Sequence, residues 1–201
     1  MKIIGYAEDS LTLWALSNKL DQILAKLRDN TAKSDCVVFY RPSFGRKGGN
    51  RSSEFGEFDA IIGTHKYTYL IESKWDGLKN LPEYIVKLSD VQIRRHIVFS
   101  WYFQEWRKVK SNDWREFSES IRGEFTKHFS GKPVPQANTI LANNLSFILN
   151  KLTPFSGKTK NILFFFHRSI AKPRVLINHD SFDCIHLKYC TLNSSGLINL
   201  S

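Results

Sequence analysis

Two acidic residues and a lysine come close together in the stretch Glu57–Trp75, which the sequence predicts to be a β-hairpin. Its apolar, aromatic and β-branched residues are typical of two paired strands. Side chains alternate between the faces of a strand, so Glu72 and Lys74 are expected to point the same way. A turn at His65–Lys66 places Asp59 directly opposite Glu72, and a slip of one residue would separate them. The pattern therefore predicts two carboxylates and one ammonium group in one small patch.

This grouping of charges suits a divalent cation. Facing carboxylates repel each other, and an apolar strand raises the free energy of their charged forms further. Mg²⁺ takes oxygen ligands from one or two carboxylates and keeps several waters. Such an ion polarises a phosphoryl oxygen and lowers the pKa of a bound water, while Lys74 beside it could orient that water or balance charge on the phosphate. The sequence therefore favours phosphodiester hydrolysis at this hairpin.

Asp59 is followed, after a spacer of twelve residues, by Glu72-Ser73-Lys74 at the end of an apolar strand. This arrangement resembles the motif of the PD-(D/E)xK nuclease superfamily, which includes type II restriction endonucleases and archaeal Holliday-junction resolvases. The resemblance implies a restriction-endonuclease-like fold, Asp59 and Glu72 as ligands of Mg²⁺ (with Mn²⁺ as a substitute), and Lys74 as the catalytic lysine. Phe58 stands where the family usually has proline. The alternative is a surface hairpin with a cross-strand ion pair.

The same resemblance suggests two further polar residues for the site. An N-terminal helix supplies one more acid to the metal in many members of the family, and Glu8 is the candidate here. An acidic residue that stabilises a helix N-terminus is the alternative for Glu8. A glutamine often points to the site from the helix after the lysine strand, which makes Gln92 a candidate, whereas a buried amide satisfied by the backbone is its alternative. His96, on the same stripe, is expected to be a packed histidine.

Basic residues around the hairpin are candidates for contacts with DNA phosphates. The candidates are Arg46, Lys47, Arg51, Arg94 and Arg95. The first three lie in the glycine-rich stretch 43–56, which is long for a connection within a compact domain, and loops of that length commonly bind ligands. A solvated hairpin connection is the alternative. The last two lie on the predicted helix that follows the hairpin, where exposed charges are common without any binding role.

The charge balance favours a polyanionic partner. The chain of 201 residues carries 29 Lys and Arg against 19 Asp and Glu, a net charge of +10, which indicates nucleic acid before an anionic membrane. Its three cysteines have no zinc-site spacing and suggest a reducing compartment. A signal peptide and an apolar run of membrane-spanning length are not evident, so we expect an intracellular, cytoplasmic protein that does not enter a membrane.

The order of elements predicts an α/β (α+β) fold, with a mixed central β-sheet flanked by helices. Predicted helices span residues 9–29, 82–108, 113–129 and 139–152. Predicted strands besides the hairpin are Cys36–Arg41, Ile162–His167, Val175–Asn178 and Cys184–Leu187, and the last eleven residues look loosely structured. The continuous apolar run in Ile162–His167 is typical of a strand buried on both faces. We expect one nuclease domain, 1–201; a C-terminal subdomain from about residue 131, after a proline-rich linker, is the alternative.

The leading hypothesis is a Mg²⁺-dependent DNA endonuclease, most like a type II restriction enzyme that cuts double-stranded DNA. Cutting both strands needs two sites, so we expect a homodimer. A structure-selective resolvase or repair nuclease is the alternative within the same class. A nucleic-acid-binding module without catalysis is a second class, since it needs only a basic surface and exposed aromatic residues. The acids clustered on a basic protein argue against that second class.

Overall fold

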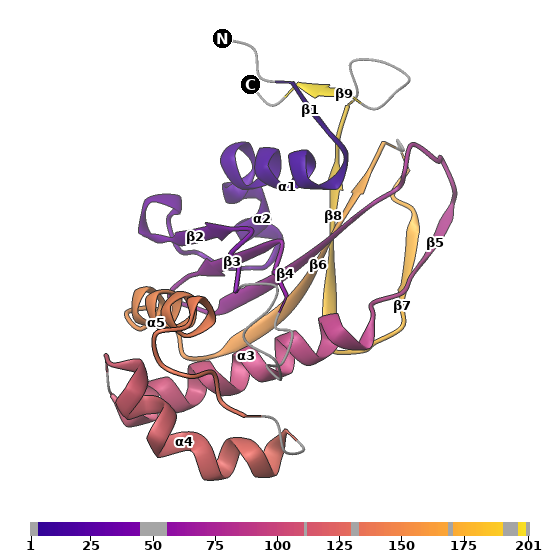
Figure 1. The fold of residues 1–201 in the computed structure, drawn as a ribbon. Coiled ribbons are helices and arrows are strands. Elements are labelled where there is room, and N and C mark those ends of the chain that lie inside the picture. The colour runs from indigo at the N-terminus through magenta and orange to yellow at the C-terminus, as the bar shows by residue number, and fades with distance from the viewer. Residues whose placement is uncertain are drawn as a thin grey trace.

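The computed structural model describes residues 4–44, 56–110, 112–129, 133–168, 171–190 and 197–199. A five-stranded mixed sheet in the order β2-β3-β4-β6-β8 forms its centre (Figure 1). The strands are β2 (Val37–Tyr40), β3 (Ala60–Gly63), β4 (Thr68–Trp75), β6 (Thr159–His167) and β8 (Phe182–Lys188). The first two pairings in that order are antiparallel and the last two are parallel. The fold is therefore mixed α/β, as the order of elements predicts.

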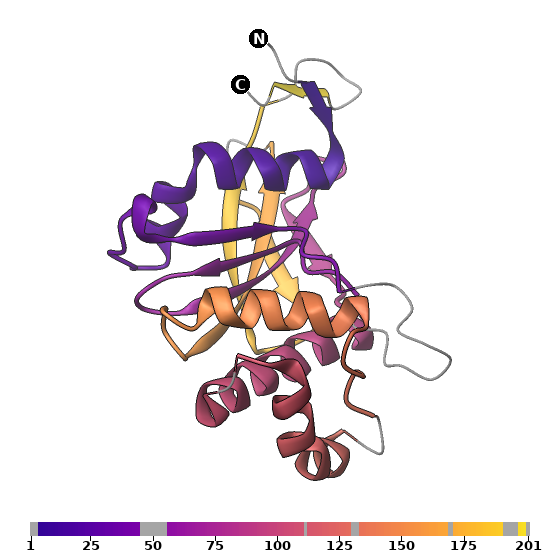
Figure 2. The same ribbon diagram turned by 60° about the vertical axis from the view of Figure 1, so that its left-hand side comes forward.

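Helices cover both faces of the central sheet. The helices are α1 (Ala7–Asn18), α2 (Leu20–Lys26), a 3₁₀ helix (Lys33–Asp35), α3 (Asp90–Val109), α4 (Trp114–His128) and α5 (Ile140–Leu152). Figure 2 shows the sheet between α1 on one side and α5 on the other, and the two apolar cores follow the same division. Within the described residues, every helix is too short or too polar to cross a membrane.

Two small sheets complete the fold. The strands β5 (Glu83–Val86) and β7 (Arg174–Ile177) run parallel beside the central sheet, and β1 (Ile4–Tyr6) pairs with β9 (Leu197–Asn199) in antiparallel fashion. The second pairing brings the two ends of the chain together (Figure 1). It also corrects the expectation that the last eleven residues are loosely structured, because three of them form a strand against the N-terminal segment.

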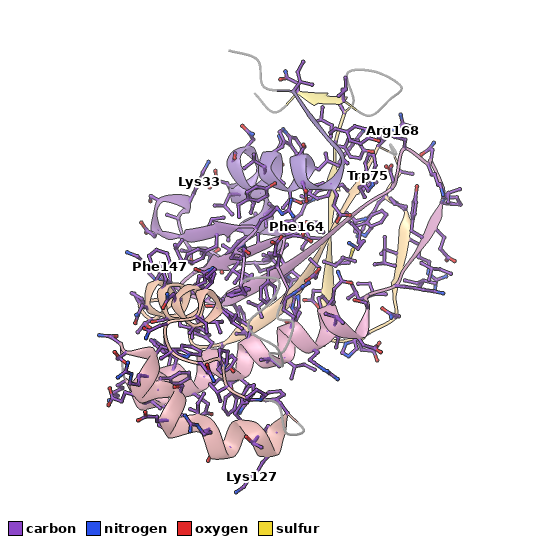
Figure 3. All side chains as sticks on the ribbon, viewed as in Figure 1. Lys33, Trp75, Lys127, Phe147, Phe164 and Arg168 are labelled. Atoms are coloured by element: carbon purple, nitrogen blue, oxygen red, sulfur yellow. The ribbon has the colours of Figure 1, made fainter. Side chains whose placement is uncertain are left out.

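The central strands alternate between the two cores. On β4, Leu70 packs with α3, α4 and α5, while Ile71 packs with α1 and α2. On β6, Phe164 packs with the α1 side and Phe165 with β5 and β7. Figure 3 shows Phe164 deep inside the molecule, and both phenylalanines are almost fully buried. The prediction of a strand covered on both faces is confirmed, and each buried Phe contributes about 1.5–3 kcal/mol.

Two predicted helices have different bounds in the structure. The stretch 82–108 begins with strand β5, whose residues alternate between exposed and half-buried or buried positions as β-strand residues do, and α3 starts only at Asp90. Ser89 caps α3, which explains that start. The stretch 9–29 is divided at Lys19, whose ψ of 10° interrupts the helical backbone between α1 and α2.

The part of the chain that follows residue 131 shares the sheet and the core of the part before it. β6 lies inside the central sheet and β8 at its edge. α5 packs in the same apolar cluster as α3 and α4. In the described residues, the elements after residue 131 therefore share one sheet and one apolar cluster with those before it.

Candidate functional site

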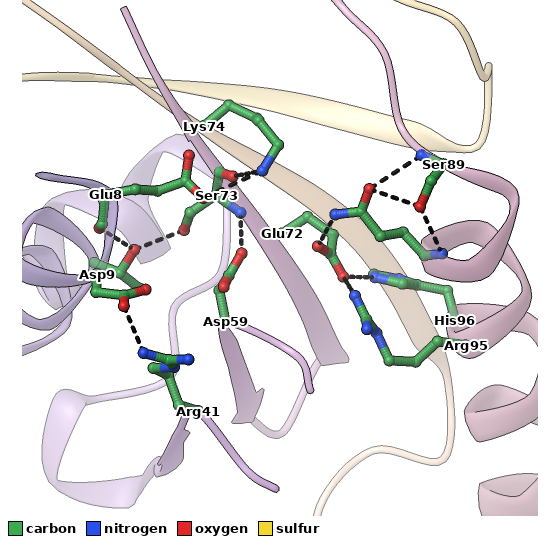
Figure 4. Close-up of polar contacts among 12 residues, drawn as sticks. Glu8, Asp9, Arg41, Asp59, Glu72, Ser73, Lys74, Ser89, Arg95 and His96 are labelled. Carbon is green, nitrogen blue, oxygen red and sulfur yellow. Dashed lines mark hydrogen bonds and ion pairs between the residues drawn. The ribbon is translucent and has the colours of Figure 1, made fainter. Parts of the chain in front are cut away.

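The acid and lysine motif lies at the C-terminal end of β4, between the first turn of α1 and the first turns of α3 (Figure 4). β3 pairs with β4 in the register that sets Ala60 opposite Ile71. This is the predicted register, and its continuation by one residue sets Asp59 opposite Glu72. The structure therefore brings the two carboxylates to neighbouring strand positions, as the sequence predicts.

Asp59 stands where the ladder between β3 and β4 ends. Its backbone N–H donates to the Ile71 carbonyl at 3.2 Å, and its own carbonyl accepts from the Arg41 N–H at 3.1 Å. Beyond that point the side chain of Asp59, in place of its backbone, bonds to β4, since Oδ2 accepts the Ser73 N–H at 2.6 Å. Burial, and then the charge of Glu72, raise the pKa of Asp59 to about 7. Asp59 is thus an acid whose charged form is poorly stabilised by its surroundings.

Glu72 lies on the side of β4 that faces α3, and it is fully buried. Its Oε1 accepts from Arg95 Nη2 at 2.5 Å and lies 3.0 Å from His96 Nε2, while its Oε2 accepts from Gln92 Nε2 at 2.7 Å. Burial alone would raise the pKa of Glu72, but His96 and Arg95 outweigh it and hold the pKa below its ordinary value. A carboxylate has about four acceptor positions, so three donors leave little of its capacity unused.

The three partners of Glu72 share one face of α3. Gln92, Arg95 and His96 follow one another at helical spacing, which points all three side chains toward β4. The helix is fixed in that rotation partly by its N-terminal cap: Gln92 Oε1 accepts the Ser89 N–H at 3.0 Å, and the Gln92 N–H donates to Ser89 Oγ at 3.3 Å. The Gln92 oxygen therefore serves the backbone, and its nitrogen serves Glu72.

His96 is packed in the core, as predicted, and it also holds Glu72. Its Nδ1 lies 2.8 Å from Asn161 Oδ1, and its ring centre is 4.8 Å from that of Phe58. The Arg95 guanidinium lies 5.2 Å from the centre of the same Phe58 ring. Phe58, which stands where the resembled family has proline, therefore supports two of the three partners of Glu72. Sequence reasoning did not link His96 to Glu72, although its four-residue spacing from Gln92 could have suggested it.

Lys74 and Glu8 meet on the other side of β4. Lys74 Nζ donates to Glu8 Oε1 at 3.1 Å and to the Ser73 carbonyl at 2.7 Å. The lysine ammonium therefore turns toward α1 and does not follow Glu72 toward α3, as Figure 4 shows. Burial raises the pKa of Glu8, and Lys74 offsets only part of that rise. Thr12 fixes α1 against the strand, because its Oγ1 donates to Ser73 Oγ at 2.8 Å.

Arg41 joins two further acids at the edge of this group. Its guanidinium pairs with Asp9 at 2.5 Å and with Glu57 at 3.0 Å, so the start of α1 is linked to the residue that leads into Asp59. The φ of Arg41 is 45°, a left-handed conformation that is uncommon for a residue with a side chain. Glu57, an acid near the predicted motif, is therefore engaged in an ion pair.

The predicted DNA contacts have different outcomes. Arg46, Lys47 and Arg51 lie outside the described residues. Arg94 is exposed on α3, where a phosphate could reach it. The interpretation of Arg95 as a surface phosphate contact is wrong for this structure, because its side chain is only 7% exposed and neutralises the buried Glu72. A buried carboxylate without a positively charged partner costs several kcal/mol of stability, whereas an exposed phosphate is stabilised by water.

The carboxylates suit a hard cation in their chemistry but are not yet gathered around one point. In the part of the chain that the structure describes, His, Cys, Asp and Glu side chains do not form a group of three that could hold a metal ion as they stand. Glu8, Asp59 and Glu72 nevertheless supply the oxygen ligands that Mg²⁺ prefers. The raised pKa values of Glu8 and Asp59 mark two acids whose charged forms a cation would stabilise. The donor set therefore fits Mg²⁺, with Asp59 as its centre.

Searches of protein families, curated proteins and solved structures gave a uniform result: no family model, no curated protein and no solved structure matches this chain. The functional argument therefore depends on the residues themselves. Its strongest element is the meeting of Asp59, Glu72 and the Lys74–Glu8 pair at one end of β4.

Proposed function

We propose that this protein is a divalent-metal-dependent endonuclease that acts on DNA. The observation that carries the proposal is the arrangement at the end of β4, where a strand register sets Asp59 opposite Glu72 and a helix contact pairs Lys74 with Glu8. These residues are distant in the sequence, so the arrangement depends on the fold. The net charge of +10 supports a polyanionic substrate.

Asp59 and Glu72 are the residues that would hold Mg²⁺, and Glu8, which pairs with Lys74, is the candidate for a third carboxylate. The bound ion would supply polarisation of a phosphoryl oxygen and a more acidic water. Gln92, Arg95 and His96 keep Glu72 deprotonated and fix the orientation of its carboxylate. Lys74 is half-buried and can donate to a phosphate oxygen or hold a water, which balances the negative charge that develops on the phosphate.

Cleavage of supercoiled plasmid DNA tests this proposal. We expect wild-type protein to cut in Mg²⁺ and not in EDTA, and Mn²⁺ to replace Mg²⁺. Lys74→Ala is expected to lower the rate by about 10²–10³-fold, the usual effect of removing one group that stabilises transition-state charge. Lys79→Ala, an exposed lysine beyond β4, is the matched control and should cut at the wild-type rate. Undiminished cleavage by Lys74→Ala, or any cleavage in EDTA, would reject the mechanism.

The finer proposal is a homodimer that cuts double-stranded DNA at a short sequence, with a structure-selective resolvase as the alternative. A panel of plasmid, four-way junction and flap substrates separates the two. Discrete plasmid fragments that end at one recurring sequence support the restriction type, whereas preference for the junction supports a resolvase. Sedimentation of the protein with and without DNA measures the dimer.

A nucleic-acid-binding module without catalysis is the second candidate, and the surroundings of Glu72 favour it. A carboxylate that already has three donors is typical of a structural ion-pair cluster. This candidate predicts salt-sensitive DNA binding that Asp59→Asn and Lys74→Ala leave unchanged, together with no cleavage in Mg²⁺ or Mn²⁺.

A further inference from the structure

A basic cavity lies away from the acidic group, between the C-terminal end of α2 and the first residues of β6 and β8. Its volume is about 520 Å³, within the range of roughly 300–1,000 Å³ that is common for small-molecule sites. Three cations and several apolar side chains line it. The cations are Lys26, Arg28 and Lys160, and the apolar residues include Leu27, Phe182 and Ile185.

Positive charge in this cavity is only partly balanced. Lys160 pairs with Asp183 at 2.6 Å, an acid whose side chain is 60% exposed. Among the described residues, the Arg28 guanidinium has no hydrogen bond or ion pair, while the Arg28 carbonyl accepts from the ammonium of Lys66. A second exposed cation thus lies next to Arg28. The cavity therefore presents more positive than negative side chains to a ligand.

The neighbouring titratable groups respond to that charge. The pKa of His186 is lowered to about 4, first by burial and then by Lys172, His167 and Lys26. The pKa of Lys26 is lowered by burial and by Lys172. Burial is the largest cause of both shifts, and the nearby positive charges add to it.

The cavity and Glu72 lie on opposite faces of the sheet. Lys160 sits opposite Tyr69 near the start of β4, whereas Glu72 sits opposite Leu163 further along the strand. Asn161 contacts His96 on the α3 side, so Lys160, the preceding residue, points to the α2 side. A ligand in the cavity is therefore separate from the residues proposed for catalysis.

We propose that this cavity is a second anion site that binds the phosphate group of a nucleotide, either free or within a DNA strand. Arg28 and Lys160 contact the phosphate, because both line the cavity and reach solvent, whereas the ammonium of Lys26 donates to the His186 carbonyl. Leu27 and Ile185 supply apolar surface for the body of the nucleotide. The volume suits a nucleotide better than a bare ion, and binding here does not require catalysis at Asp59.

Equilibrium binding with two probes tests the inference: thymidine 5′-monophosphate and a fluorescently labelled thymidine oligonucleotide. The variant is Arg28→Gln combined with Lys160→Gln, which leaves the contact of Lys26 with β8 in place. Lys127→Gln is the control, because that lysine points into solvent at the end of α4 (Figure 3). We expect the double variant to bind about tenfold more weakly, with a shallower salt dependence, since two charge-assisted contacts are lost.

The pattern of loss identifies the source of the phosphate. Weaker binding of both probes supports a site for free nucleotide, and weaker binding of the oligonucleotide alone supports a DNA strand. Affinity within about twofold of wild type for both probes, or no binding of either probe by wild type, would overturn the inference. Both probes are measured in EDTA, in which the proposed Mg²⁺ site takes no metal, so a failure of the nuclease proposal leaves this result separate. Thermal melts of the double variant confirm that it is folded.

Discussion

The two carboxylates that face each other across β3 and β4 lie in opposite surroundings. Glu72 has three side-chain donors from α3, and its pKa is held below the ordinary value. Asp59 accepts one backbone N–H, and its pKa is raised to about 7. Both are largely buried, so burial alone does not decide which acid stays charged; the supply of donors does. Glu72 is a stable built-in anion, and Asp59 is the acid that an added cation would stabilise most.

The first prediction concerns the ion pair between Arg95 and Glu72. Arg95→Met removes the buried cation and leaves an under-compensated carboxylate, so we expect the free energy of unfolding to fall by about 3 kcal/mol. Arg94→Met, on the exposed face of the same helix, is the matched control and should change it by about 0.5 kcal/mol or less. Urea unfolding measures both variants, and equal midpoints would show that Glu72 does not depend on Arg95.

Substitution of Gln92, a second partner of Glu72, is expected to cause a smaller loss of stability. Gln92→Ala removes one donor to Glu72 and half of the capping box with Ser89, which together are worth about 2 kcal/mol of stability. Gln104→Ala, an exposed glutamine on the same helix, should be nearly neutral. A Gln92 variant as stable as the Gln104 variant would mean that the cap and the contact with Glu72 contribute little.

The expected binding of a cation by Asp59 is tested by measuring stability in the presence of Mg²⁺. At a Mg²⁺ concentration about ten times Kd, binding to the folded state raises the free energy of unfolding by about 1.4 kcal/mol. Asp59→Asn should abolish that gain, whereas Asp35→Asn, an exposed acid distant from the site, should retain it. Chemical unfolding with and without Mg²⁺ measures the difference. Identical gains in all three proteins would place any bound Mg²⁺ elsewhere.

Asp59 also predicts a pH dependence of stability in EDTA. The folded-state pKa of Asp59 lies at about 7, above the ordinary value of 3.8, so the folded protein binds this proton more tightly than the unfolded chain does. The resulting stabilisation is complete below about pH 4 and is lost as the pH rises through 7. The difference in stability between wild type and Asp59→Asn should therefore shift against wild type over that interval. Parallel profiles would contradict the raised pKa.

Local patterns in the sequence predict the register of the hairpin and the centre of the sheet. The turn residues and the alternation of β3 and β4 suffice to set Asp59 opposite Glu72. The continuous apolar run of β6 suffices to predict a strand covered on both faces. Both features depend on neighbours in the chain. The helix predicted over 82–108 begins too early, because residues 83–86 form β5, whose conformation depends on pairing with β7, distant in the sequence.

The partners of the motif depend on tertiary contacts and are harder to predict. The sequence predicts Arg95 to be a surface cation, and only the packing of α3 against β4 shows that it neutralises Glu72. The meeting of Glu8 with Lys74 requires α1 to cross the end of the sheet, and the family resemblance gave only a candidate. His96 contacts Glu72 because α3 is rotated about its axis so that this histidine points toward β4. The cap at Ser89 helps to set that rotation.

The central claim is that Asp59 and Glu72 share a divalent cation, and anomalous diffraction from crystals soaked in Mn²⁺ tests it most directly. The account predicts one strong anomalous peak between the two carboxylates, within about 2.0–2.2 Å of an oxygen of each, as for small hard divalent ions. It also predicts that Asp59→Asn loses the peak. No peak at this position, with Glu72 still held by Gln92, Arg95 and His96 and Asp59 still bound to Ser73, would contradict the claim.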